Sequence, residues 1–418
     1  MSLRARRAWQ STVSIPCNFM KKHSLLIILI LLLATSCVLT GKKEKGFIQP
    51  EVKPAYNLKE LPLRHKVGQL FVIRPEYLDT TLTPQQIYEG QIAGSRQITS
   101  AMQDFYNQYP AGGIVLFYRN IENPQQLTAF TDAIHSLGSN YPLVCIDEEG
   151  GRVARIANND AFDVPKYESM QVIGDTANQE LALECGLSIG TYLRRYGIDV
   201  DFAPVADVNT NPDNTVIGDR AFSSDPVIAG NLCSAFLQGL EQRGVQGCLK
   251  HFPGHGDTKT DSHLGYVELD KTLEQLGKAE LLPFKIGIQN GADMIMSAHI
   301  AVPKVTGSKE PSSLSDVMLT QILREQLGFN GIIITDALEM RAVSNEYDSA
   351  AACIKALEAG ADILLMPFDY VQAFEGVLAA VQDGRISEER IDQSLERIEA
   401  LKNKIHYYVA GSDRNIIY

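Results

Sequence analysis

The chain has 418 residues, of which 45% are hydrophobic and 21% charged, and a formal net charge of −12. This composition is typical of a globular chain with a large core and argues against a disordered or fibrous protein. The acidic balance argues against a nucleic-acid partner, because binding to phosphates requires an excess of lysine and arginine.

A short apolar run behind basic residues occupies the amino end. The run from Leu25 to Ala34 is shorter than the roughly 20 residues that cross a membrane, which indicates a secretory signal. It leads into Leu-Ala-Thr-Ser-Cys ending at Cys37, which resembles a bacterial lipobox. We expect residues 1–36 to be a signal region, with Met20 as an alternative start, and Cys37 to carry lipid. An uncleaved anchor with a chance cysteine is the alternative.

Residues 37–58 are expected to be the lipidated cysteine and a tether. The sequence Gly-Lys-Lys-Glu-Lys-Gly from Gly41 to Gly46, with two prolines further on, has no apolar period. Residues 59–418 alternate between apolar runs and amphipathic stretches, which predicts one folded domain. A lipid-anchored protein of the bacterial cell envelope, facing the periplasm or the outside, follows from these boundaries.

Eight short apolar runs of strand length recur after the tether. They are Gln69 to Ile73, Gly113 to Phe117, Leu143 to Ile146, Val200 to Pro204, Gly247 to Leu249, Met294 to Met296, Gly331 to Thr335 and Asp362 to Met366. These runs are apolar throughout, which is typical of parallel strands that are buried on both faces.

Amphipathic helical stretches separate the runs. They include Asn178 to Tyr196, Pro226 to Arg243, Leu273 to Gln289, Asp316 to Leu327 and, last, Ser387 to Ile405. Strand followed by helix, eight times over, predicts an α/β fold, a (β/α)8 or TIM barrel with no second domain behind it. A doubly wound open sheet has the same local pattern and is the alternative.

Acids, imidazoles and cations gather behind the strand runs, where a barrel carries its chemistry. They are the stretch from Asp147 to Arg152, Asp207, Lys250 with His251, His299 and Asp336. The five cysteines beyond Cys37 instead sit in apolar contexts and are expected to be core thiols, not a disulfide framework. They are Cys145, Cys185, Cys233, Cys248 and Cys353.

The loop KHFPGHGDTKTDSH, from Lys250 to His263, holds three of the eight histidines. As a metal site it lacks the helical spacing and the cysteines typical of zinc sites. As a proton-transfer unit it places Asp261 two residues before His263, so the carboxylate can hold one ring nitrogen and leave the other for a leaving group. Purely structural histidines are the third interpretation.

KHFPGHG followed by DSH, with IDEEGGRVAR upstream and IIITDALEM downstream, resembles glycoside hydrolase family 3, in its β-N-acetylhexosaminidase branch. The resemblance runs from about Leu61 to the carboxyl end. It implies a retaining exo-β-N-acetylglucosaminidase that acts on cell-wall or chitin-type oligosaccharides without a cofactor or metal. Asp336 is then the nucleophile, and His263 is the acid/base with Asp261 as its orienting partner. We expect a monomer.

The same resemblance implies the residues that contact the sugar, which are Asp147, Arg155, Arg220, Lys250 and His251. Two departures stand out. Glu148 occupies a position where many relatives have glutamine, which suggests an adjustment to the substrate, and Ala337 replaces a second aspartate behind the nucleophile. A metal-dependent hydrolase that uses the histidine loop and a catalytically inactive sugar-binding lipoprotein are the two alternative functions.

Overall fold

The computed structural model describes residues 56–258 and 265–411, with side chains up to residue 406. All of them belong to one compact unit, Pro54–Tyr418. The predicted signal region 1–36, Cys37 and the tether up to residue 55 lie outside the described residues, as do Asp261 and His263.

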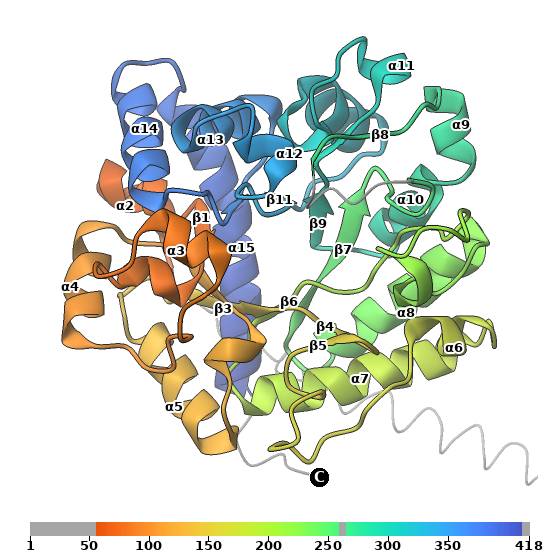
Figure 1. The fold of residues 1–418 in the computed structure, drawn as a ribbon, viewed down its shortest axis with the longest axis horizontal. Helices are drawn as coiled ribbons and strands as arrows, with labels where there is room; N and C mark the ends of the chain where they lie inside the picture. Colours follow the sequence, from red (N-terminus) through yellow and green to blue (C-terminus); the bar gives the residue numbers. More distant parts are fainter. Residues whose placement is uncertain (1–55, 259–264, 412–418) are drawn as a thin grey trace, which may run out of the picture. The chain divides into compact units, whose positions relative to one another are not determined.

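Eight parallel strands form the central sheet, in the order β11-β9-β7-β6-β3-β2-β1-β12 (Figure 1). A parallel bridge between Ile334 and Ile363 joins its two ends and closes the barrel. The strands are β1 (Phe71–Ile73), β2 (Gly113–Leu116), β3 (Leu143–Ile146), β6 (Val200–Asp201), β7 (Gln246–Phe252), β9 (Met294–Ser297), β11 (Ile332–Thr335) and β12 (Leu364–Leu365). Each of them falls on a predicted run, so the (β/α)8 barrel is confirmed.

Every residue of these eight strands is buried, because barrel interior covers one face and helices cover the other. The five cysteines of this region are free and buried, which confirms them as core thiols. Two short ladders stand outside the barrel sheet. They are the antiparallel pair β4 (Glu148–Gly150) and β5 (Val153–Ala154), and the parallel pair β8 (Val267–Glu268) and β10 (Ile300–Ala301).

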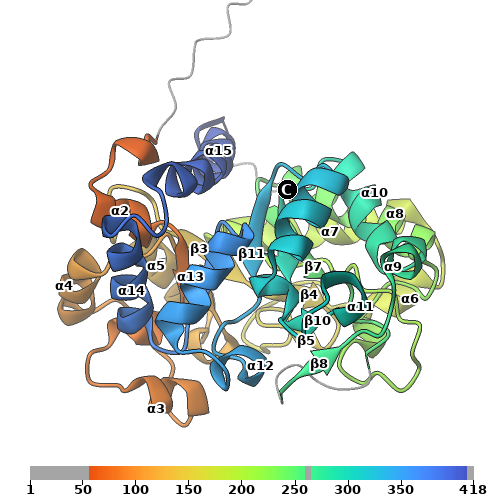
Figure 2. The same cartoon turned by 90° about the horizontal axis from the view of Figure 1, so that it is seen from above.

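Helices surround the barrel (Figure 2). Those that follow a strand and cover the sheet are α4 (Ser100–Gln108), α5 (Pro124–His135), α7 (Gln179–Arg195), α8 (Pro226–Glu241), α10 (Leu281–Gln289), the π-helical segment η6 (Val317–Gln326), α13 (Ser349–Ala359) and α14 (Tyr370–Gln382). Shorter helices in the loops are α2 (Leu63–Gly68), α3 (Pro84–Glu89), α6 (Met170–Gly174), α9 (Leu273–Lys278), α11 (Pro303–Thr306) and α12 (Arg341–Ser344). The last helix of the described residues is α15 (Glu388–Gly411).

Local signals explain where these helices begin. The Asp225 carboxylate, for example, accepts the N–H groups of Val227 and Ile228 at 2.8 and 3.0 Å, and Pro226 opens α8 with a φ angle suited to a first turn.

The prediction of one helix from Leu273 to Gln289 is wrong, since the structure has α9 and α10 there. Ala279 leaves the helical region, with φ −132° and ψ −77°. The next residue, Glu280, turns inward, is 1% exposed and pairs with Lys271. A buried ion pair at this point is incompatible with a straight amphipathic helix whose polar residues face solvent.

Lys402 of α15 is a fully buried amine that pairs with no carboxylate of the described residues. Its Nζ donates to Gln69 Oε1 at 2.7 Å and to the Asn140 carbonyl at 2.8 Å. Burial lowers the pKa of Lys402 to about 7, although Asp199 nearby acts in the opposite direction. The folded state therefore releases a proton that the unfolded chain keeps up to its ordinary pKa of about 10.4.

We predict that the stability of the protein rises with pH through this group. The penalty for charging Lys402 is fully present below pH 7 and disappears progressively as pH rises toward the unfolded pKa. Between pH 7 and 9 the wild type should gain about 2 kcal/mol of unfolding free energy relative to Lys402→Met, at about 1.4 kcal/mol per pH unit. Urea unfolding of both proteins at each pH measures this, and a difference independent of pH would contradict it.

Candidate active site

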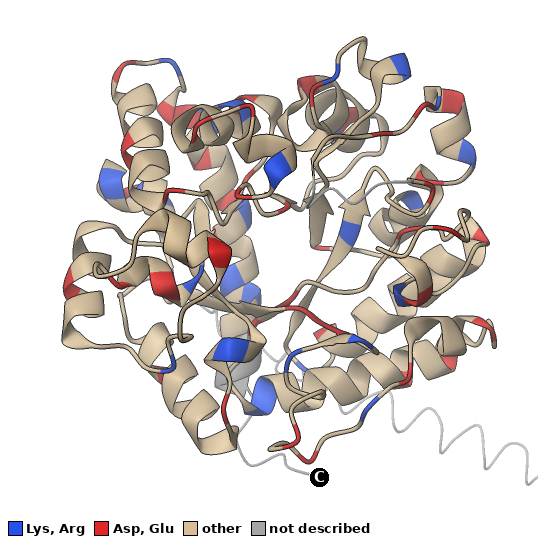
Figure 3. Ribbon diagram, viewed as in Figure 1, with Lys and Arg blue, Asp and Glu red and all other residues tan. Residues whose placement is uncertain are grey.

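Acids and cations meet at the end of the barrel where the strands finish. Lys250 of β7 places its Nζ 2.7 Å from Asp147 Oδ1 and 2.6 Å from Glu149 Oε1. Arg220, from the 3-10 turn η4 (Gly218–Arg220), grips Glu149 with two hydrogen bonds of 2.7 and 2.8 Å. Arg155 reaches Asp147 Oδ2 at 3.3 Å. Figure 3 marks the basic position on β7 and the acidic stretch that leads into β4.

This cluster has two levels. The side chains of Asp147 and Arg155 keep 19% and 23% of their surface exposed, whereas those of Lys250 and Glu149 keep 3% and 1%. Asp147 and Arg155 are therefore the members that a ligand can reach. Lys250 is buried beneath them and pairs with Asp147.

The charges stabilise one another. Burial alone would raise the pKa of Asp147 and of Glu149, but Lys250 and the neighbouring arginines hold both pKa values below the ordinary range. Burial alone would lower the pKa of Lys250, and the two carboxylates raise it instead. All three groups are thus ionised at neutral pH, and a ligand that enters the site meets fixed charges.

The two glutamates of the Asp-Glu-Glu stretch face opposite ways, because they are successive residues of β4. Glu149 faces Lys250, and the sequence analysis did not single it out. Glu148 is fully buried and accepts the N–H groups of Arg155, Ile156 and Ala157 and the Tyr192 hydroxyl of α7. Burial raises its pKa. Glu148 holds the backbone that carries Arg155 and does not face the site, so the geometry does not support the expected direct effect on substrate.

His251 of β7 is held by a buried aspartate. Its Nδ1 lies 2.7 Å from Oδ2 of Asp207, in the loop after β6. The following turn is fastened to the same carboxylate through the N–H of His255. His255 also contacts Thr258, with Nδ1 at 2.6 Å from the hydroxyl oxygen, and its burial lowers its pKa. The turn leads directly to Asp261 and His263, which lie outside the described residues.

Asp336 directly follows β11, and its N–H donates to the Ser297 carbonyl of β9 at 2.8 Å. Its Oδ1 accepts the N–H of Ala337 at 2.8 Å, which fixes the carboxylate at the strand end. Buried His299 braces the same segment, with Nε2 at 2.9 Å from the Ala337 carbonyl and Nδ1 at 2.7 Å from the Ser313 hydroxyl.

A second set of contacts, which was not predicted from the sequence, holds the Asp336 segment. Arg74, which follows β1, pairs with buried Glu339, and Tyr77 donates to Glu339 at 3.3 Å. The guanidinium carbons of Arg74 and Arg155 lie 5.0 and 5.7 Å from the ring centre of Phe117. Arg74 could have been predicted as a site residue, because it is a charged residue directly after the first strand run.

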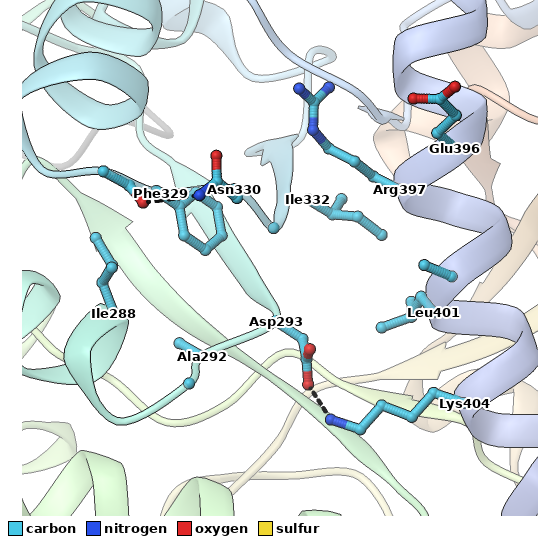
Figure 4. A pocket seen from close by; sticks show the side chains of 14 residues that line it. Ile288, Ala292, Asp293, Phe329, Asn330, Ile332, Glu396, Arg397, Leu401 and Lys404 are labelled. Carbon is cyan, nitrogen blue, oxygen red and sulfur yellow. Dashed lines mark hydrogen bonds and ion pairs between the residues drawn. The ribbon is translucent and has the colours of Figure 1, made fainter.

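A cavity of about 520 Å³ lies at the opposite end of the barrel (Figure 4). Asp293 and Gly331, which precede β9 and β11, line it together with Arg397 and Lys404 of α15. Within the described parts of the chain, no three histidine, cysteine, aspartate or glutamate side chains are arranged to hold a metal ion.

A closed (β/α)8 barrel with paired acids and bases at the strand ends is the architecture of an enzyme that works through its βα loops. Residues 62–401 match the Glycosyl hydrolase family 3 N terminal domain, and the chain belongs to this family. The resemblance seen in the sequence is therefore confirmed.

Individual relatives agree with the family assignment. The chain is 36% identical to a protein named Beta-hexosaminidase A of Pseudoalteromonas piscicida, over 73% of this chain and 55% of that one. It is 39% identical to a Beta-hexosaminidase of Hydrogenovibrio crunogenus, over 67% of this chain and 78% of the relative. The solved family 3 β-N-acetylglucosaminidase of Paenibacillus sp. str. FPU-7 aligns with a TM-score of 0.75 at 35% identity, over 84% of this chain and 64% of that one. The chain thus spans only 55% and 64% of two of these relatives.

Proposed function

We propose that the protein is a retaining exo-β-N-acetylglucosaminidase that removes terminal β-linked N-acetylglucosamine from cell-wall or chitin-type oligosaccharides. The observation that carries the proposal is the placement of Asp336 at the same barrel end as the accessible pair Asp147 and Arg155. The names of the relatives, hexosaminidase and β-N-acetylglucosaminidase, support the choice of sugar.

In the proposed reaction, the Asp336 carboxylate attacks the anomeric carbon while the bond to the leaving oxygen breaks. His263 gives its proton to that oxygen, and Asp261 stabilises the imidazolium form beforehand. Water then attacks the glycosyl-enzyme, His263 takes a proton from it, and Asp336 is released. Two inversions at one carbon return the β configuration.

Sugar binding falls to Asp147, Arg155, Arg220, Lys250 and His251 in this proposal. Asp147 and Arg155, as the exposed pair, accept from and donate to sugar hydroxyls. Lys250 and Arg220 act from below by keeping Asp147 and Glu149 ionised and in place. Contacts that tighten as charge develops on the sugar ring lower the barrier.

The proposal is tested with an aryl β-N-acetylglucosaminide, with and without a chelator. We expect hydrolysis that the chelator leaves unchanged, and NMR should show the β anomer of N-acetylglucosamine first. Loss of activity on chelation would favour the metal-dependent hydrolase, and binding without turnover would favour the inactive sugar-binding protein. An α anomer at early times would make Asp336 a general base.

We further propose that lipid on Cys37 anchors the protein to the cell envelope. No helix within residues 56–258 and 265–411 has the length and apolarity needed to cross a membrane. We expect Cys37→Ser to move the protein from the membrane fraction to the soluble fraction with its kcat unchanged. Cys353→Ser, at a buried free thiol, is the matched control and should stay membrane-bound. Retention of Cys37→Ser in the membrane fraction would contradict the lipid anchor.

A further inference from the structure

Asp207 is a fully buried carboxylate whose two oxygens are occupied by three donors. Oδ2 lies 2.7 Å from His251 Nδ1. Oδ1 accepts the backbone N–H groups of His255 at 2.5 Å and of His251 at 3.2 Å. Burial alone would raise the pKa of Asp207, but the hydrogen bonds that its carboxylate accepts from His251 and from the His255 N–H act in the opposite direction.

An ionised carboxylate only accepts hydrogen bonds, so His251 must carry a proton on Nδ1. When the imidazole is neutral, its other nitrogen, Nε2, then bears a lone pair. No group of residues 56–258 or 265–411 bonds Nε2, and the His251 side chain keeps 11% of its surface exposed at the strand end that carries the site. An acceptor that no described residue occupies therefore lies on β7, the strand that also carries Lys250.

We propose that Asp207 is a positioning residue that holds the ring proton of His251 on Nδ1, so that Nε2 accepts a hydrogen bond from a hydroxyl of the bound sugar. This inference rests on the proposed function, since it takes the sugar as the ligand. Under this proposal the site selects substrates that carry a hydrogen-bond donor at this position, because an acceptor there would repel the Nε2 lone pair.

The hydrogen-bond donors around Asp207 predict how Asp207→Asn changes the tautomer of His251. Two backbone N–H groups point at Oδ1, so the amide oxygen of the asparagine belongs there. The amide N–H₂ then faces His251 Nδ1, which must become the acceptor, and the ring proton moves to Nε2. The variant keeps the shape of the site and reverses the polarity of the nitrogen that meets the sugar.

NMR of the full chain labelled with ¹⁵N-histidine tests the tautomer, with the His251→Gln spectrum identifying the His251 signals. We expect Nδ1 protonated and Nε2 bare in the wild type, and the reverse in Asp207→Asn. A proton on Nε2 of the wild type, alone or together with Nδ1, would overturn the proposal. The wild-type spectrum requires no activity and, beyond His251→Gln for the assignment, no variant, so it decides the tautomer even if the proposed function fails.

Kinetics test the consequence. Values of kcat/KM are compared for an aryl N-acetylglucosaminide and its 3-, 4- and 6-deoxyfluoro analogues, because fluorine cannot donate. The wild type should discriminate against one analogue, and Asp207→Asn should reduce that discrimination roughly tenfold, the value of one hydrogen bond to a fixed partner. Unchanged discrimination in a folded Asp207→Asn would overturn the role in specificity.

Asp199→Asn is the matched control. Asp199 is equally buried and holds His135 Nε2 at 2.8 Å, but it precedes β6 and so lies at the other end of the barrel. Its variant should show the same discrimination between hydroxyl and fluorine as the wild type.

Discussion

Asp336→Ala is expected to lose turnover by roughly 10⁴-fold or more on every substrate, which is the range of losses seen when a covalent nucleophile is removed. The reason is that no glycosyl-enzyme can form, however good the leaving group is. The loss should appear in kcat, and binding of N-acetylglucosamine should persist, because Asp147 and Arg155 are untouched. Steady-state kinetics on aryl and natural substrates, with product titration, measures both.

Asp348→Ala is the control for Asp336→Ala. Asp348 lies in the same β11 to α13 connection, where its carboxylate caps α13 by accepting the Ala351 N–H at 2.8 Å. Its loss should cost about 1 kcal/mol of stability and leave turnover intact. Asp336→Ala with substantial activity, or Asp348→Ala with an equal loss, would remove Asp336 from the role of nucleophile.

His263→Ala is expected to separate substrates by their leaving groups. Natural sugars leave as alkoxides that need a proton, so their hydrolysis should fall by about 10²–10⁴-fold. Activated aryl groups leave without that help, and their first step should be largely spared, although the glycosyl-enzyme then lacks a base to activate water. His406→Ala, at the far end of α15, is the control and should leave both rates unchanged.

Azide needs no deprotonation, so it should restore turnover of His263→Ala on aryl substrates and form a β-glycosyl azide. Asp261→Asn should fall between the wild type and His263→Ala, because it keeps a partner for the imidazole but removes the charge that stabilises its protonated form. Equal losses on alkyl and aryl substrates, with no effect of azide, would show that His263 is not the acid/base.

The barrel could be predicted from the sequence because each strand is buried on both faces and so forms an uninterrupted apolar run. The β3 run, Leu143–Ile146, was predicted to the residue. The break between α9 and α10 could not be predicted, since it depends on Glu280 meeting Lys271, a tertiary contact that leaves the local apolar period intact.

The positions of Asp147 and Asp336 could be predicted, because each residue directly follows a strand. The different contacts of Glu148 and Glu149 could not be predicted. They depend on which face of β4 contacts Lys250 and which face contacts Tyr192. The hydrogen bond between Asp207, in the loop after β6, and His251 of β7 joins residues that are 44 positions apart, and no local pattern reveals it.

Mass spectrometry of the glycosyl-enzyme tests the central claim most directly. We expect slow hydrolysis of the intermediate in His263→Ala, so an activated aryl N-acetylglucosaminide should leave the protein heavier by one N-acetylglucosaminyl group. Peptide mapping should place that group on Asp336, and azide should remove it. An unmodified protein under conditions of rapid aryl release, or a sugar attached elsewhere, would contradict the account.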